Sequence, residues 1–115
     1  MRRAFRAARY TTGTEIVVAL AGQVGGAKLT DGIARLLGAD CAIVVNTGDD
    51  YEHLSLAFCP DLDTLLYTLS GVGSPSTSWE PAGDTQALYG MLERLGGPDR
   101  LALGDMALAA PTWRS

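Results

Sequence analysis

The sequence predicts an α/β fold in which helices flank a parallel sheet. The first observation is the order of elements. An apolar, β-branched run at 15–20 leads through a glycine-rich turn into an amphipathic helix at 27–37, and a second apolar run follows at 41–45. The second observation is that neither run alternates with polar residues, which is typical of parallel strands covered on both faces. A chain of 115 residues is long enough for one domain with one core.

The later elements follow from turn residues and helical periodicity. In order, we expect a loop over 47–60, a helix over 61–69, a loop over 71–83, a helix over 84–95 and a third strand at 101–103. Asp61 is a candidate N-cap for the second of the three helices. Each helix has an apolar face expected to pack on the sheet. These faces consist of Leu29, Ile33, Leu36 and Leu37, then Leu62, Leu65, Leu66 and Leu69, then Leu88, Met91, Leu92 and Leu95.

Charge is unevenly distributed along the chain. Residues 1–14 contain four arginines and no acidic residue, whereas residues 15–115 contain 13 acidic and 5 basic residues. An acidic body argues against a nucleic-acid partner, and one that handles an anionic substrate needs a cation such as Mg²⁺. We expect residues 1–14 to be a disordered basic extension, with an organelle-targeting peptide as the alternative, and residues 15–115 to form the domain.

Neither a membrane partner nor a secreted location is expected. The longest apolar runs are too short to cross a bilayer, and the N-terminus lacks the apolar stretch of a secretory signal. Neither Cys41 nor Cys59 has a second cysteine or a histidine at metal-ligand spacing. We therefore expect a cytoplasmic protein with two free thiols.

The glycine-rich turn is the first candidate for a ligand site. Residues 22–28 read Gly-Gln-Val-Gly-Gly-Ala-Lys between the first strand and the first helix. Glycines let the backbone approach a ligand closely, and a helix N-terminus favours an anion. The spacing does not fit the dinucleotide fingerprint, and it departs from the nucleoside-triphosphate loop at Ala27 and Leu29. The turn indicates a bound anion without naming a cofactor, and the alternative is a tight turn that binds nothing.

Carboxylates are the second candidate. Asp49 and Asp50 follow the second strand, and Asp61 and Asp63 begin the next helix. Like charges gathered together are costly unless a cation neutralises them, and oxygen ligands suit Mg²⁺. The alternative is a solvated acidic loop. His53, in the same loop, is more typical of a structural hydrogen bonder than of a catalytic base.

Residues 82–85 are a further candidate, with Asp84 at a helix start. Capping explains that aspartate without a ligand. Three roles stay open for Trp79 just upstream: a lid, a stacking surface, or packing within the loop.

Six short segments then occur in a specific order. They are Gly-Gly-Ala-Lys at 25–28, Val-Asn-Thr-Gly-Asp-Asp-Tyr-Glu-His at 45–53, Pro-Asp-Leu-Asp-Thr at 60–64, Leu-Tyr-Thr-Leu at 66–69, Gly-Asp-Thr at 83–85 and Leu-Gly-Asp at 103–105. Together they make the chain resemble, over about 15–105, the 2-phospho-L-lactate transferase family of coenzyme F420 biosynthesis. Each segment alone is weak, and the six together are specific.

The resemblance implies a Rossmann-like fold and a definite reaction. In that family, a phospholactyl-type group moves from a GMP-activated phospho-acid donor to the deazaflavin Fo, GMP is released, and Mg²⁺ assists. The assembly compatible with this interpretation is a homodimer. The implied catalytic residues are Asp63 and Asp50, and the implied magnesium ligands are Asp49, Asp50 and Asp63. The implied substrate contacts are Gly22, Gly25, Gly26 and Lys28 on phosphate, together with Asn46, Thr47, Thr64, Asp84 and Asp105.

The sequence also departs from the family. After Leu-Gly-Asp the family usually carries Arg-Asp-Leu-Ala-Thr-His, whereas residues 106–111 read Met-Ala-Leu-Ala-Ala-Pro, so a cation is missing there. Family members also run much longer, so we expect this chain to be a truncated, N-terminal copy. Two alternatives stay open. A sister group binds nucleotide-sugars and regulates metabolism, but its members usually lack the element found at 60–64. The other alternative is an inactive remnant domain.

Overall fold

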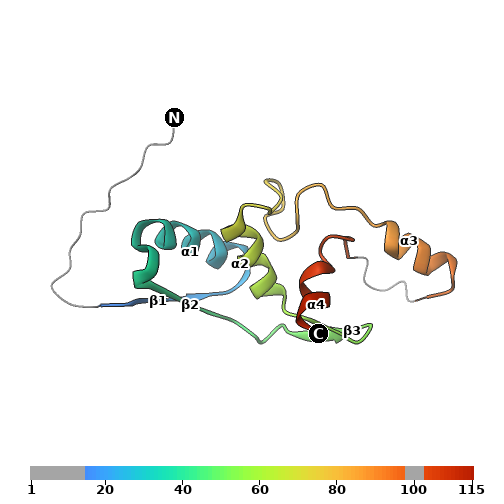
Figure 1. Ribbon diagram of the computed structural model, residues 1–115, viewed down its shortest axis with the longest axis horizontal. Coiled ribbons are helices and arrows are strands. Elements are labelled where there is room, and N and C mark those ends of the chain that lie inside the picture. The colour runs from blue at the N-terminus through green and yellow to red at the C-terminus, as the bar shows by residue number, and fades with distance from the viewer. Residues whose placement is uncertain (1–14, 98–102) are drawn as a thin grey trace.

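The computed structural model describes residues 15–97 and 103–115 (Figure 1). Within this part a strand–helix–strand unit is followed by two short strands and then by three helices, and the two strand pairs form separate sheets. The elements are β1 (Val17–Ala21), α1 (Gln23–Leu37), the 3₁₀ turn η1 (Gly38–Asp40), β2 (Cys41–Val45), β3 (Tyr51–His53), β4 (Leu56–Phe58), α2 (Pro60–Ser70), α3 (Ala87–Arg94) and α4 (Ala109–Arg114).

Strands β1 and β2 run parallel, with helix α1 as the crossover between them. Val17 pairs with Cys41 and Ala21 pairs with Val45, so the two strands end together. The bounds of the second strand agree with the prediction. This βαβ unit confirms the α/β, Rossmann-like fold class.

Helix α1 begins earlier than expected, and the predicted glycine turn is wrong. Gly22 is the extended N-cap, and its carbonyl accepts from the Gly26 amide at 3.2 Å, so residues 23–26 already form the first helical turn. A Cβ at Gly26 would lie 3.2 Å from the Ala21 Cα. Glycine at position 26 therefore lets the helix start directly against the end of β1.

The predicted apolar face of α1 is also wrong. Ala27 and Thr30 are buried, whereas Leu29 is 64% exposed and Leu36 is 60% exposed. The helix packs against α2 and β1 along a stripe of small residues. A small-residue stripe permits close approach, and the leucines point away because no described element covers them.

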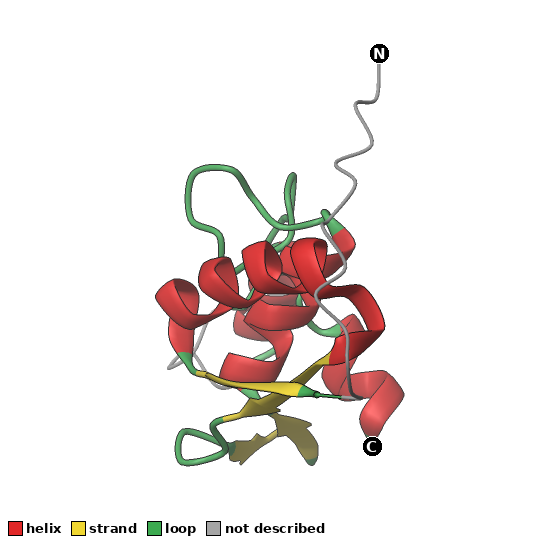
Figure 2. Ribbon diagram, turned by 90° about the vertical axis from the view of Figure 1, so that its left-hand side faces the viewer, coloured by secondary structure: helices red, strands yellow, loops and turns green. Residues whose placement is uncertain are grey.

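Helices lie on one face of the β1–β2 sheet, as Figure 2 shows. On the other face Val18, Leu20 and Val44 are exposed by 57%, 78% and 54%. The expectation of a sheet covered on both faces is therefore not met within residues 15–97 and 103–115.

The predicted loop over 47–60 contains a hairpin that the sequence did not predict. Strands β3 and β4 pair antiparallel, with Tyr51 opposite Phe58 and their rings stacked at 5.2 Å. Leu54 and Ser55 connect the strands with φ of +52° and +60°. The hairpin escaped prediction because such turns usually carry Asn or Gly at these positions.

Helix α2 begins at Pro60 with Cys59 as its N-cap, so the prediction of Asp61 as cap is wrong. Pro60 supplies the fixed φ suited to a first helical position and lacks only an amide that would be unpaired there. Asp61 then lies in the first turn, where its side chain is free to bond other segments.

A second core lies away from the parallel sheet. Phe58, Tyr89 and Leu108 are buried against one another, and the His53 ring stacks on the Tyr89 ring at 6.3 Å. Helix α3 contributes only Tyr89 to the fully buried set.

The predicted inward face of α3 is wrong for three of its four residues, whereas the fourth, Leu92, packs against the second core. Leu88, Met91 and Leu95 are exposed by 44%, 49% and 77%. The helix also starts three residues later than expected, because the backbone at 84–86 turns to meet the loop at 103–107.

Two predicted segments lie wholly or partly outside the described residues. Residues 1–14 lie outside the described residues, as do 101–102 of the predicted third strand, and Leu103 is not in a strand. Cys41 and Cys59 are both free. Among the described helices, none is long and apolar enough to cross a membrane.

Candidate functional site

A cavity of about 940 Å³ lies between the start of α1, helix α2 and the loops at 74–86 and 103–107. Its size is that of a pocket for a cofactor-sized molecule. Its aromatic lining consists of Tyr51, Phe58, Tyr67 and Trp79, and its acidic lining consists of Asp61, Asp63, Glu80 and Asp84. The start of α1, directly after β1, borders the cavity, which is typical of sites near the carboxyl ends of parallel strands. No residue of the loop over 46–50, which follows β2, lines it.

Asp61 joins three elements at the floor of this cavity. Its Oδ1 accepts from the Gln23 amide at 2.7 Å, and its Oδ2 accepts from the Asn46 Nδ2 at 2.7 Å. The carboxylate is 6% exposed. The start of α1 is a favourable place for an anion, and here that anion includes the chain's own Asp61.

The loop after β2 is organised by Asn46. Its Oδ1 accepts from the Gly48 amide at 3.1 Å, and its Nδ2 lies 3.4 Å from the Asp49 Oδ2. The Asp50 amide donates to the Thr47 carbonyl at 3.2 Å. The loop is thus a compact turn that keeps Asp49 and Asp50 exposed at the surface.

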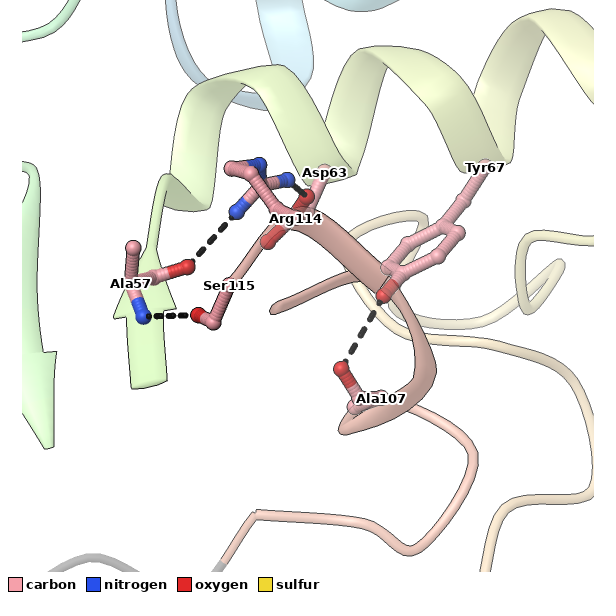
Figure 3. Close-up of polar contacts among 6 residues, drawn as sticks. All are labelled: Ala57, Asp63, Tyr67, Ala107, Arg114 and Ser115. Carbon is pink, nitrogen blue, oxygen red and sulfur yellow. Dashed lines mark hydrogen bonds and ion pairs between the residues drawn. The ribbon is translucent and has the colours of Figure 1, made fainter. Parts of the chain in front are cut away.

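Asp63 is a buried carboxylate whose pKa departs from its ordinary value. It is 7% exposed, and burial raises its pKa while the Arg114 guanidinium opposes that rise. Figure 3 shows the arrangement: Arg114 Nη2 donates to Asp63, and Arg114 Nη1 donates to the Ala57 carbonyl at 2.7 Å. Asp63 is therefore an ion-paired residue in this structure.

Tyr67 lies one helical turn from Asp63 on α2 and also faces the cavity. Burial, helped by the charges of Asp63 and Asp84, raises its pKa to about 12. Its hydroxyl donates to the Ala107 carbonyl over a long 3.4 Å. The neutral phenol is thus available as a weakly engaged donor on the cavity wall.

Asp84 and Asp105 join the two loops of the cavity, because each carboxylate accepts hydrogen bonds from the segment that carries the other. Asp84 accepts from the Met106 and Ala107 amides at 2.7 and 2.9 Å. Asp105 accepts from the Thr85 hydroxyl and from the amides of Ala87 and Leu88, at the start of α3. These hydrogen bonds, that of Thr85 first, lower the pKa of Asp105.

The backbone of Gly104 lies directly against the Asp84 carboxylate. A Cβ at Gly104 would overlap the Asp84 carboxylate, so only glycine fits at that position. Asp84 and Asp105 therefore have clear structural roles, although Asp84 also reaches the cavity surface.

The structure brings together only part of the predicted set. Asp63, Thr64 and Asp84 line the cavity. The lining does not include Gly22, Gly25, Gly26, Lys28, Asn46, Thr47, Asp49, Asp50 or Asp105. Asn46 acts indirectly by bonding Asp61, and a Cβ added at Gly22 would lie 3.4 Å from the same carboxylate. Lys28 borders a separate hollow of about 190 Å³. The substrate roles of these residues stay predictions.

Sequence reasoning singled out none of Gln23, Tyr51, Phe58 and Tyr67 as site residues, yet all four line the cavity. Tyr51 and Tyr67 did carry a signal, because each lies inside one of the segments that support the family resemblance. Trp79 lines the cavity with 53% of its surface exposed, which fits a stacking surface or a lid at the entrance.

The predicted magnesium ligands do not lie together in the described structure. Within 15–97 and 103–115, no three side chains of His, Cys, Asp or Glu gather as ligands. Asp63 is the buried carboxylate of the predicted trio, and Arg114 already engages it. As arranged here, Asp49, Asp50 and Asp63 do not form a complete magnesium site, and the magnesium assignment stays a prediction.

Comparison with known proteins identifies similar sequences. Residues 17–96 match the family model described as 2-phospho-L-lactate transferase CofD. The chain is 39% identical over 102 residues to a phosphoenolpyruvate transferase of Kitasatospora aureofaciens, covering 86% of this chain and 32% of the relative. It is 41% identical over 96 residues to a 2-phospho-L-lactate transferase of Methanopyrus kandleri, covering 84% of this chain and 31% of the relative. The chain thus spans about a third of the length of these relatives.

Proposed function

The chain belongs to the 2-phospho-L-lactate transferase family, and from that premise we propose that it holds the acceptor side of a transferase site in coenzyme F420 biosynthesis. The proposed reaction moves a phospholactyl-type or phosphoenolpyruvyl-type group from a GMP-activated donor to the deazaflavin Fo. Relatives named for both kinds of group match this chain, so the acid on the donor is left open. The match to the transferase model favours this activity over the nucleotide-sugar-binding sister group.

The main support for the proposal is that the cavity is lined by both aromatic and acidic side chains. Tyr51, Phe58, Tyr67 and Trp79 supply aromatic surfaces, which suit the flat ring system of a deazaflavin. Carboxylates lie on the same cavity wall at Asp61, Asp63 and Asp84. A ligand with a planar ring and a polyhydroxylated side chain matches both parts of the lining.

The chemistry follows from a hydroxyl acceptor. The terminal hydroxyl oxygen of Fo attacks the donor phosphorus, a new phosphorus–oxygen bond forms, and the bond from that phosphorus to the GMP phosphate oxygen breaks. The hydroxyl proton must leave, and we assign its acceptance to the Asp63 carboxylate. Burial raises the pKa of Asp63, which makes its carboxylate a better proton acceptor than an exposed aspartate. Asp50, whose charge acts on Asp63, has a supporting electrostatic role in this proposal.

Magnesium is part of the proposal as the cation that screens the donor phosphates. The acidic lining gives a reason for it, because an anionic donor is repelled by Asp61, Asp63 and Asp84 unless positive charge is present. Because the predicted ligands do not gather in this structure, no step of the reaction above is assigned to the metal.

The test is a fluorescence titration of the chain with Fo, with and without Mg²⁺. Asp63→Asn is the test variant, and Asp31→Asn on α1, outside the cavity, is the matched control. We expect binding by the control and wild type, and at least about a tenfold loss in Asp63→Asn, since a hydrogen bond to a charged group is removed. Wild-type chain that is folded by circular dichroism yet does not bind Fo would refute the acceptor-site assignment. Equal binding of Fo by the wild type and both variants would show that Asp63 has no part in it.

A further inference from the structure

We infer that the Arg114 guanidinium occupies the place of the cation at Asp63, so that a divalent metal binds this carboxylate only in competition with the arginine. The inference rests on the proposed function, in which Asp63 belongs to a magnesium-assisted site. It goes beyond that function by assigning a cation from the chain itself to this carboxylate.

The contact is well anchored. Arg114 Nη2 donates to Asp63 Oδ1, while Nη1 of the same guanidinium donates to the Ala57 carbonyl at 2.7 Å (Figure 3). The side chains of Arg114 and Asp63 are 24% and 10% exposed. A partly buried ion pair with a second hydrogen bond is held more firmly than a surface pair.

Helix α4 delivers the arginine to this position. Leu108 and Pro111 are buried, so the start of α4 is fixed against the second core. At its end, the Ser115 hydroxyl accepts from the Ala57 amide at 3.1 Å, so Ala57 of β4 holds both Ser115 and Arg114. Helix α4 is thus held by contacts at both ends that do not involve Asp63, so loss of the Asp63 contact would leave those anchors in place.

The other basic side chains of the described residues lie elsewhere. Lys28 borders the separate hollow, Arg35 pairs with Asp31 on the exposed side of α1, and Arg94 lies in the last turn of α3. Within the described part of the chain, Arg114 is thus the one basic side chain that bonds a carboxylate of the cavity. The guanidinium already occupies Asp63 Oδ1, and its charge repels a metal ion approaching the same oxygen.

The experiment measures metal binding directly and needs no substrate. Mn²⁺ and Mg²⁺ are titrated into the wild-type chain, Arg114→Gln, Arg114→Gln/Asp63→Asn and the matched control Arg35→Gln, with calorimetry and, for Mn²⁺, electron paramagnetic resonance as readouts. We expect Arg114→Gln to bind the metal about tenfold more tightly than wild type, which is within the usual range of coupling between two sites. Arg35→Gln should bind like wild type, and the double variant should lose the gain.

Several outcomes would overturn the inference. These are equal or weaker metal binding by Arg114→Gln, no binding by it at all, or an equal gain in Arg35→Gln. If Arg114→Gln does not fold, the wild-type chain decides the question. Metal should then shift the side-chain ¹⁵N resonance of Arg114, assigned with Arg114→Lys, and binding without that shift would exclude competition.

The result is separable from the fate of the proposed function. Tighter metal binding by Arg114→Gln, together with no binding of Fo by any variant, would keep the competition and reject the acceptor site. Binding of Fo, together with metal binding that Arg114→Gln does not change, would keep the acceptor site and reject the competition.

Discussion

Replacing Asp61 should weaken the fold, because this carboxylate joins three elements. Its two oxygens accept from the Gln23 amide and the Asn46 Nδ2, both at 2.7 Å. Those donors belong to the start of α1 and to the residue after β2, while Asp61 itself lies in α2. Asp61→Ala leaves both donors without this acceptor in a part-buried place, so the junction of three elements loses its common partner.

The magnitude follows from these two contacts. A hydrogen bond to a charged group contributes about 1.5–3 kcal/mol, and exposure of Asn46 places its contact at the lower end of that range. We expect Asp61→Ala to lower the free energy of unfolding by about 3 kcal/mol, and Asp61→Asn by about half of that, because its amide keeps one acceptor oxygen. For a chain of this length, a loss of about 3 kcal/mol lowers Tm by roughly 12 °C.

The assay is urea denaturation followed by circular dichroism, with Asp31→Asn as a surface control. A double-mutant cycle with Asn46→Ala isolates the second contact, and we expect a coupling of about 1–2 kcal/mol. A loss below about 1 kcal/mol for Asp61→Ala, or no coupling to Asn46, would refute the reasoning. That result would mean that the cost of burying the carboxylate cancels what its hydrogen bonds contribute.

Three further predictions follow from local geometry and charge. A methyl group added by Gly25→Ala meets no atom within 4 Å, so this variant should stabilise α1 by about 0.5–1 kcal/mol. A methyl group added by Gly26→Ala meets the backbone of β1, so this variant should destabilise the fold by about 1–2 kcal/mol. Equal changes of Tm in the two variants would contradict this prediction. Burial raises the pKa of Asp63 and Arg114 opposes the rise, so the native state binds the Asp63 proton more tightly than the unfolded state, and the free energy of unfolding falls as pH rises above the ordinary carboxyl range. In Arg114→Gln the free energy of unfolding should fall further with pH than in the wild type, because the opposing guanidinium is gone. Relative to the wild type, the variant should lose about 2 kcal/mol of this free energy near pH 7 and less near pH 4. A loss in urea titrations that does not depend on pH would contradict this prediction. Spectrophotometric titration should show a tyrosine pKa of about 12 that Tyr67→Phe removes, and an unchanged alkaline transition in that variant would be evidence against the assignment.

Much of the parallel sheet and the neighbouring helix was predictable because their signals are local. The apolar run at 41–45 lies between a helix stop and a polar loop, and the strand has those bounds. Pro60 and the leucines after it mark α2 within one residue at each end. The hairpin at Tyr51–His53 and Leu56–Phe58 was missed because its turn lacks the residues that usually mark one.

The site was less predictable because its contacts join distant segments. The sequence placed Asp61 and Asp63 in one acidic group, yet Asp61 bonds Gln23 and Asn46 while Asp63 bonds an arginine 51 residues away. No spacing rule distinguishes two carboxylates that lie two positions apart, because their partners come from different elements.

The sequence by itself determined the family and the βαβ order. Periodicity, turn residues and motif spacing depend on near neighbours, so they can be recognised without coordinates. The tertiary structure alone decided which leucines are buried, that Asp84 and Asp105 exchange hydrogen bonds between loops, and that Arg114 pairs with Asp63. Burial and pairing depend on what a distant segment brings to the same place, and that is fixed only when the chain is folded.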